Sequence, residues 1–312
     1  MDVLTQVLAA TRTGPPRYLH IECRAPWRRL HPPVPGAELH VILQGTCHLI
    51  TPAGAPIALG VGDVVLLPHG SRHETADHPD TPLPGVESPS SEGEFRFPQH
   101  VGSDQTDGSP PSTVLLSSTY PIDRAQCHPV LNDLPEIIHL PAHLGQRPTL
   151  RVTIDQISGE LRHPGIGSDG VLRALLDALL LYVLRAWYQE HGTGPGWGPA
   201  LNDPAISTAL CSIHNDPGRQ WTVEDLGTEV GLSRAAFARR FTALVGRPPL
   251  AYLTWSRMGA AAQILRDSDE PVGIVAQRVG YTSEFAFSNA FKRMHGAAPG
   301  TYRRRHRALR LR

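Results

Sequence analysis

Two stretches of the C-terminal third decide the fold: DLGTEVGLSRAAFARRF at residues 225–241 and IVAQRVGYTSEFAFSNAF at residues 274–291. In each, a tiny residue (Gly227, Ala276) follows an aliphatic one, and the dipeptide Val-Gly begins three residues later. A hydroxyl residue follows, and two phenylalanines then stand four positions apart. The repeated pattern predicts two helix-turn-helix units joined by a long helix.

Each position in this pattern has a physical role where two helices cross. The tiny residue lets the helices approach closely, and the glycine of Val-Gly supplies the positive φ that ends the first helix. Ser233 in the first copy, and Thr282 or Ser283 in the second, can cap the next helix by accepting from its free N–H groups. The phenylalanines lie one turn apart and fill the inner face of that helix. The opposite face of each second helix is therefore left for solvent or a partner.

Charge is divided unevenly along the chain, although the 29 basic and 29 acidic side chains balance overall. Residues 1–199 hold seven more acidic than basic side chains, and residues 200–312 hold seven more basic than acidic ones. This division is expected where one module meets a polyanion and another does not. No apolar run approaches the ~20 residues that span a bilayer. The start lacks a signal-type stretch and the four cysteines form no C-x-x-C pair, so we expect a cytoplasmic protein without a membrane anchor, disulfide scaffold or zinc knot.

Residues 205–305 resemble the DNA-binding domain of the AraC/XylS family of transcription regulators. The most specific stretch reads GY at 280–281, F at 287, AFKR at 290–293, G at 296, PG at 299–300 and YR at 302–303. The resemblance implies two helix-turn-helix units joined by a helix at about 249–265. Their second helices would enter successive major grooves of double-stranded DNA, ~34 Å apart. It also implies an activator that acts with RNA polymerase.

Side-chain chemistry assigns roles to the outward positions of the two second helices. Arg239 can pair in two-pronged fashion with guanine and Asn289 with adenine, while Glu284 can accept from cytosine. Ala235 and Ala238 offer methyl contact, Ser288 bonds to several bases, and Phe285 covers a thymine methyl or packs locally. Phosphate contacts, which carry no sequence information, are expected from Arg234, Arg240, Lys292 and Arg293.

The N-terminal half has a different pattern, of short apolar segments bounded by turn residues. The segments at 39–43, 47–50, 57–59, 64–67 and 113–116 predict strands of a barrel or sandwich. Residues 79–112 hold seven prolines and six acidic residues and predict a mobile loop. Apolar residues at three- and four-residue spacing predict a helix at 171–190. That helix either packs on its own barrel or pairs with a second copy in a homodimer.

This half resembles the cupin-type effector domain found in a subgroup of the same family. The resemblance rests on Trp27, LHVILQG at 39–45, GDVVLLPHGSRH at 62–73 and Leu131, Leu134 and Pro135. We therefore expect an α+β multidomain protein with a cupin-like β-barrel and flanking helices at 1–165. A helix and Gly/Pro linker that offers a dimer contact follows at 166–199, and an all-α double helix-turn-helix domain occupies 200–312.

Many cupins are metal enzymes, so a cupin metal enzyme fused to a DNA-binding module is the alternative to a regulator. The second cupin metal motif is met by Gly62, Pro68, Gly70 and His73, with Asp77 in place of its asparagine. In the first, His31 and Glu38 stand at about the right distances, but Pro33 lies where a second histidine belongs and His40 is left as a spare. We expect no enzyme activity, metal or other cofactor; a metal, if bound, would take His31, Glu38 and His73.

The signal that controls such a regulator is either a small-molecule effector or an oxidant. Cys23 stands near Arg24, Arg28 and Arg29, and neighbouring cations favour the reactive thiolate. Cys23 is therefore the candidate redox residue.

Overall fold

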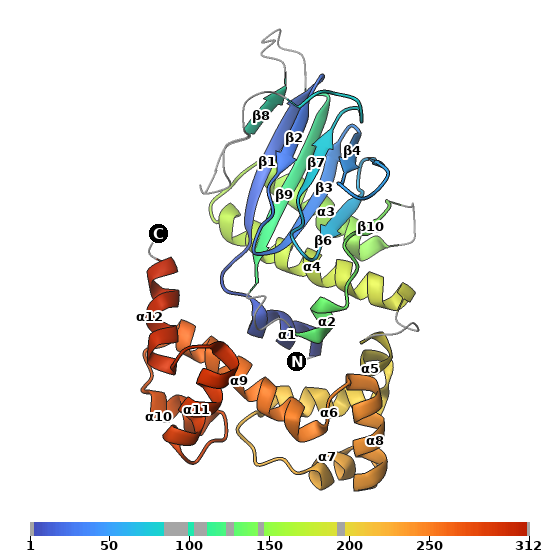
Figure 1. Cartoon of the computed structure of the whole chain (residues 1–312). Helices are drawn as coiled ribbons and strands as arrows, with labels where there is room; N and C mark the ends of the chain where they lie inside the picture. The colour runs from blue at the N-terminus through green and yellow to red at the C-terminus, as the bar shows by residue number, and fades with distance from the viewer. Residues whose placement is uncertain are drawn as a thin grey trace. The chain divides into compact units, whose positions relative to one another are not determined.

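The computed structural model describes residues 3–83, 99–102, 111–122, 128–142, 147–191 and 197–310 (Figure 1). The chain forms two compact units. One, here called the sheet unit, comprises Arg12–Arg124 and Leu134–Trp187. The other, the helical unit, comprises Met1–Thr11, Ala125–Asp133 and Tyr188–Arg312. Within the described residues, no helix has the length and apolar character that crossing a membrane requires.

The sheet unit contains a six-stranded and a four-stranded sheet, with strand orders β10-β6-β3-β9-β1-β8 and β2-β7-β4-β5. Neighbouring strands pair antiparallel except β1 and β8, which are parallel. The strands are β1 (Arg17–Arg24), β2 (Arg28–His31), β3 (Gly36–Gln44), β4 (Cys47–Ile50), β5 (Ile57–Leu59), β6 (Val64–Leu67), β7 (His73–Ala76), β8 (Gln99–Gly102), β9 (Thr113–Pro121) and β10 (Ile138–Leu140).

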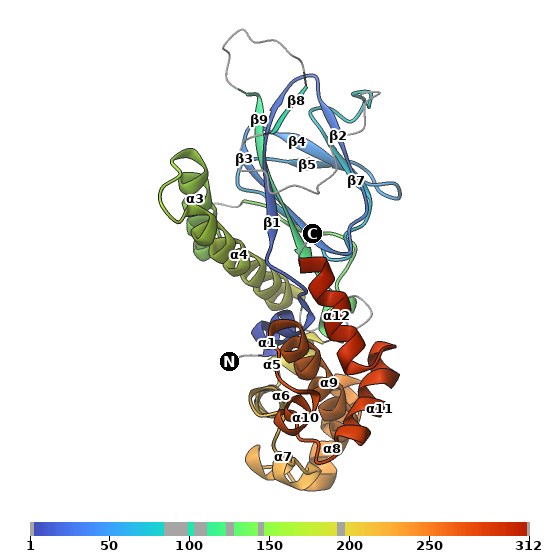
Figure 2. The same ribbon diagram turned by 90° about the vertical axis from the view of Figure 1, so that its left-hand side faces the viewer.

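The two sheets share one core, which places them face to face in the cupin arrangement. Ile21, Ile42 and Val65 of the larger sheet pack with Leu49 and Leu59 of the smaller one. The other face of the larger sheet is covered by helices, as Figure 2 shows for α3 (Pro148–Arg162) and α4 (Ser168–His191). The central strand β3 therefore buries both of its faces, and its polar side chains Glu38 and His40 lie inside the protein.

The interval at 79–112 contains one element that the sequence did not predict. Gln99–Gly102 forms β8, which pairs with β1 from Ile21 to Arg24. Residues 84–98 and 103–110 lie outside the described residues, so the expected mobile loop stays a prediction there.

The helical unit is built around α9 (Pro249–Asp267), which runs between two helix pairs (Figure 1). The pairs are α7 (Val223–Glu229) with α8 (Arg234–Val245), and α10 (Val272–Arg278) with α11 (Glu284–His295). The remaining helices are α1 (Val3–Thr11), α2 (Pro129–Asn132), α5 (Gly198–Asn202), α6 (Pro204–Asn215) and α12 (Pro299–Arg310).

Two segments from the N-terminal half of the sequence belong to this helical unit. Helix α1 contacts α6 and α9. His128, which precedes α2, is fully buried, and its Nε2 lies 2.8 Å from the hydroxyl of Tyr252 on α9. The same hydroxyl lies 2.7 Å from Nε2 of His214 on α6. The helical unit is thus larger than the expected range of 200–312.

Candidate functional site

The first helix pair has the predicted crossing and caps. Thr222 and Asp225 form a reciprocal capping box at the start of α7, and the Ser233 side chain accepts from Ala236 N at the start of α8. Gly231 adopts φ +70 between the helices. A Cβ at Gly227 would lie 2.9 Å from the carbonyl oxygen of Leu232, so this crossing requires glycine.

The second pair repeats this geometry. Gly280 adopts φ +81, and of the two candidate caps it is Ser283 whose side chain accepts from Ala286 N. The inner face of each second helix is filled as predicted, because Phe237, Phe241, Phe287 and Phe291 are all buried. Both pairs are therefore helix-turn-helix units.

The outward faces of α8 and α11 carry the predicted contact residues. In the first unit Ala235 and Arg239 are exposed and Ala238 is half-buried; in the second, Glu284, Phe285 and Asn289 are exposed and Ser288 is half-buried. Phe285 is 78% exposed, so it does not pack locally. Arg234, Lys292 and Arg293 are exposed cations. Within the described part of the chain these three and Arg239 form no ion pair, which leaves four positive charges available to phosphate or bases.

Arg240 has a partner inside the protein. Its Nε and Nη2 donate to Oδ2 of Asp203 at 2.8 and 2.5 Å. Asp203 also caps α6 by accepting from Ile206 N. The ion pair ties α8 to the start of α6, a structural role that the sequence did not indicate.

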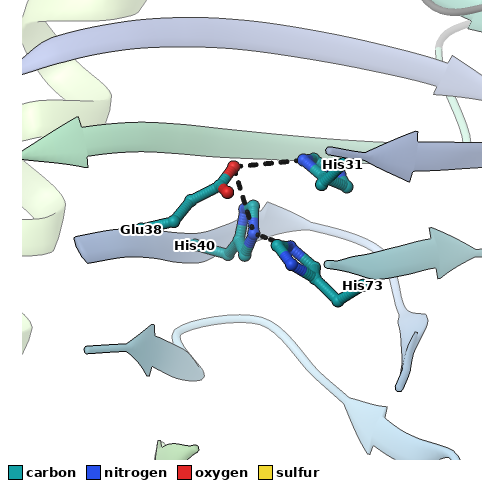
Figure 3. Close-up of side chains that lie close together, drawn as sticks. All are labelled: His31, Glu38, His40 and His73. Carbon is teal, nitrogen blue, oxygen red and sulfur yellow. Dashed lines mark hydrogen bonds and ion pairs between the residues drawn. The ribbon is translucent and has the colours of Figure 1, made fainter. Parts of the chain in front are cut away.

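A second cluster lies inside the sheet unit, where His31, Glu38, His40 and His73 are all buried (Figure 3). One ligand-type atom from each lies within 4.8 Å of the others. His31 comes from β2, Glu38 and His40 from β3, and His73 from β7. The predicted set of His31, Glu38 and His73 is thus brought together, and His40 joins it. Alternation along β3 puts positions 38 and 40 on one face, a signal in the sequence that identifies His40 as a ligand candidate.

The protonation states of this cluster suit a cation. Burial lowers the pKa of His73 to about 4 and the pKa of His40 well below its ordinary value, so both imidazoles are neutral at pH 7. Burial alone would raise the pKa of Glu38, but opposing interactions, led by the hydrogen bond with His31, lower that pKa. A carboxylate with neutral imidazoles is the state in which these groups bind metal.

Two polar atoms of the cluster have no hydrogen-bond partner. Glu38 Oε2 and His40 Nδ1 are buried and unpaired in the described residues. His73 Nδ1 donates to the carbonyl of Ser71 at 2.8 Å, so its Nε2 presents a lone pair, and His40 Nε2 lies 2.7 Å from it. A divalent cation would satisfy the facing nitrogens and the carboxylate together. Such a Ser71 carbonyl contact is the outer-shell bond typical of metal-bound histidine.

The cysteine environment bears on the redox prediction. Cys23 is fully buried in the core between the sheets. Burial raises its pKa, although Arg29 opposes the shift, so the thiol is protonated at neutral pH. The protonated form is the unreactive one. The arginine neighbours that the sequence indicated thus do not make Cys23 a thiolate here.

The fold and its two sites define a class of protein: a cupin domain joined to a double helix-turn-helix DNA-binding domain. The Cupin family model matches residues 2–189, and the Helix-turn-helix domain model matches residues 226–305. The chain belongs to the AraC family of transcription regulators with an N-terminal cupin domain.

Its relatives carry regulator names. A putative AraC-like transcription regulator of Streptomyces lividans is 32% identical over 97% of this chain and 98% of its own length. The HTH-type regulator AlkR of Acinetobacter baylyi is 30% identical over 97% and 99%. The RCS-specific activator RclR of Escherichia coli is 30% identical over 86% and 85%. Among solved structures, the DNA-binding domain of AdpA with a target DNA is 34% identical, covering 36% of this chain and 99% of that one, at a TM-score of 0.33. The relatives support a regulator over a cupin metal enzyme.

Proposed function

We propose that this regulator reads DNA bases through α8 and α11 and holds the backbone through the cations beside them. The observation that carries the proposal is the pair of capped helices, each with its phenylalanines buried and its outward face exposed. Arg240 is the exception among the outward cations, because it is held by Asp203. Arg239 and Asn289 supply two-pronged base contacts. The full base-reading set is Ala235, Ala238, Arg239, Glu284, Phe285, Ser288 and Asn289, and the phosphate set is Arg234, Arg240, Lys292 and Arg293.

The test is selection of a binding sequence from random duplex DNA by the full chain, followed by affinity measurements at several salt concentrations. We expect a preferred sequence with two half-sites one helical turn apart. Recovery of sequences without a shared motif would contradict the proposal.

A second candidate function concerns the buried cluster, favoured by the unpaired Glu38 Oε2 and the facing nitrogens of His40 and His73. A divalent transition metal, held by His31, Glu38, His40 and His73, would act as the sensed signal or as the site that binds it. When bound, such a metal supplies Lewis acidity and open coordination positions. The protein's own residues orient the ligands. The Ser71 carbonyl accepts from His73 Nδ1, and Ser117 Oγ donates to Glu38 Oε1 at 3.0 Å.

Metal analysis of the purified, metal-loaded chain tests this candidate. The sequence alone predicted no metal, but the buried cluster predicts about one equivalent of Zn²⁺, Fe²⁺ or Mn²⁺. The variant His40→Ala should lose more affinity than the ~10–100-fold that changes to outer-shell partners cost. His48→Ala, in the same unit but outside the cluster, is the matched control. Equal metal content in the two variants would rule the site out.

Three further features complete the proposal: activation together with RNA polymerase in the cytoplasm, control by a small molecule or oxidant, and pairing of two copies. Pairing is supported by α4, where Val171, Leu175, Ala178 and Tyr182 follow one face and none is fully buried. Sedimentation of the full chain tests it. We expect a dimer, and Val171→Asp combined with Leu175→Asp should yield a monomer; a monomeric parent chain would remove this part.

A further inference from the structure

The loop between α6 and α7 belongs to the first helix-turn-helix unit but lies against the turn of the second. Gln220 Nε2 donates to the carbonyl of Gly280 at 2.8 Å. A Cβ at Gly218 would lie 2.7 Å from the carbonyl oxygen of Arg278. The loop at 216–221 is therefore in backbone contact with the turn at 278–281, although about 60 residues separate them.

Arg257, on the connecting helix α9, lies at this junction. Its Nε donates to the carbonyl of Pro217 and its Nη2 to the carbonyl of Arg219, both at 2.8 Å. Its guanidinium also lies 6.0 Å from the ring centroid of Tyr281. The planar guanidinium thus binds two carbonyls of the first unit's loop and also contacts the second unit's turn. A lysine lacks both the second donor nitrogen and the planar group that these contacts require.

Glycine at position 280 serves the junction as well as the turn. Its positive φ ends α10, and a Cβ there would lie 2.6 Å from Arg257 Nη2 and 2.7 Å from the carbonyl oxygen of Gly218. Gly218 has no positive φ in the structure. Its glycine is therefore explained by the close approach to the second unit alone.

The loop is stiff enough to transmit a constraint. Trp221 is buried, and its Nε1 donates to the carbonyl of Asp216 at 2.8 Å. Arg219 N donates to Asp216 Oδ1 at 3.1 Å, and the Arg219 guanidinium stacks 3.9 Å above the Trp221 ring. Residues 216–221 are thus held in one conformation by contacts among themselves.

We infer that Arg257 is a positioning residue that locks the two helix-turn-helix units together and so sets the spacing and helical phase of the half-sites they read. Each unit packs on α9, a helix of 19 residues or roughly 28 Å, and twisting along α9 would rotate one reading helix relative to the other. The lock of Arg257, Gln220 and Gly280 opposes that rotation. The inference rests on the proposed reading of DNA by α8 and α11.

The experiment uses the full chain, its selected DNA site, and the same site with one base pair inserted between the half-sites. An insertion turns one half-site by roughly 35° about the DNA axis. The wild-type chain should lose affinity on insertion by about as much as from a mismatch, roughly 10- to 100-fold. Arg257→Ala should bind the original site more weakly than the wild-type chain. On insertion, the logarithm of its affinity should fall by less than half of the wild-type decrease. Arg257→Lys should resemble Arg257→Ala.

Two other variants separate the lock from a general loss of structure. Gln220→Ala removes only an exposed side chain's bond to Gly280 and should shift the insertion penalty in the same direction. Gln263→Ala, on α9 but in none of these contacts, should leave it unchanged. An insertion penalty that is the same in Arg257→Ala and the wild-type chain would overturn the lock.

Hydrogen exchange of the free protein tests, without DNA, whether Arg257 holds the two segments together. In Arg257→Ala, amides of both 216–222 and 278–282 should exchange faster, whereas those of α8 and α11 should not change. Unchanged exchange in the two segments would refute the inference even if the wild-type chain bound no specific sequence. Absence of any specific site would refute the proposed reading of DNA instead.

Discussion

In α8 and α11 the direction of each side chain decides its role. Phenylalanines at 237, 241, 287 and 291 point into the unit and are buried, while Arg239 and Asn289 are exposed on the outward faces. Base-reading and phosphate-binding side chains differ in what their removal does, because only a base contact carries sequence information. Substitutions on the outward faces can therefore show whether each residue contacts a base or a phosphate.

Arg239→Ala should cost about 1–3 kcal/mol of binding free energy and relax the preference at one base position. Arg234→Ala should instead weaken binding to every sequence alike and reduce the salt dependence by about one charge. Affinities for the selected site and its single-base variants, measured across salt concentrations, distinguish the two. A uniform loss in Arg239→Ala would make Arg239 a phosphate contact.

Buried histidines predict how the helical unit responds to acid. Burial lowers the pKa of His214 to about 4, whereas an unfolded histidine titrates near 6.5. Between these values the unfolded chain binds the proton first, so stability is complete above pH 6.5 and is lost as the pH falls toward 4.

The free energy of unfolding should therefore decrease by about 1–3 kcal/mol between pH 6.5 and pH 4 on account of His214. His214→Gln should show a shallower decrease over the same range. Chemical denaturation at several pH values measures both. An identical pH dependence in the two proteins would show that the fold does not lower the pKa of His214.

At the scale of elements, the helix crossings differ between the two units. Ala276 in the second unit takes the place of Gly227 in the first, where a Cβ would meet the Leu232 carbonyl at 2.9 Å and Phe237 Cβ at 3.3 Å. The first pair of helices is thus packed more closely. This difference gives opposite expectations for two glycine substitutions in helices.

Gly227→Ala should destabilise the protein by about 1–3 kcal/mol, because the added methyl overpacks the crossing. Gly170→Ala should stabilise it by about 0.4–1 kcal/mol, because Gly170 lies in α4 with open space at its Cβ position. Thermal and urea unfolding of both variants test the pair. Stabilisation by Gly227→Ala would mean that the two helices do not approach so closely.

Local patterns were enough to predict the elements that carry function. The glycine turns, the serine caps and the phenylalanine spacing depend on residues within about 17 positions of one another, and all were found where predicted. Contacts across long separations had no such local signal. The ion pair of Arg240 with Asp203 and the pairing of β8 with β1 are examples.

The candidate metal residues show a different limit, that of matching a motif by its spacing alone. Spacing selected His31, Glu38 and His73, but His40 was left out because the cupin motif expects its histidine before the glutamate rather than after it. Burial of Cys23 likewise depends on how two sheets pack, which its neighbours in sequence do not reveal. Local chemistry identified the candidates, and tertiary packing decided their surroundings.

At the scale of the whole molecule, the division of the chain does not follow sequence order. Helix α1 and the segment at 128–133 belong to the helical unit, although both precede most of that unit in the sequence and are separated from it by strands and helices of the sheet unit. Cutting the chain near residue 200 would remove packing that the helical unit uses.

A fragment of residues 200–312 should accordingly be less stable than the helical unit in the full chain. It loses His128, which contacts the Tyr252 hydroxyl, and the contacts of α1 with α6 and α9. We expect a lower unfolding temperature for the fragment by calorimetry, while α8 and α11 keep their sequence preference. Equal unfolding temperatures would show that the two segments add no stability.

The central claim is that two similar helices meet one face of a duplex, a single turn apart. A hydroxyl-radical footprint of the full chain on its selected DNA tests it most directly. The account predicts two protected clusters on one face of the duplex, 10–10.5 base pairs apart. A single cluster, or two clusters on opposite faces, would contradict it.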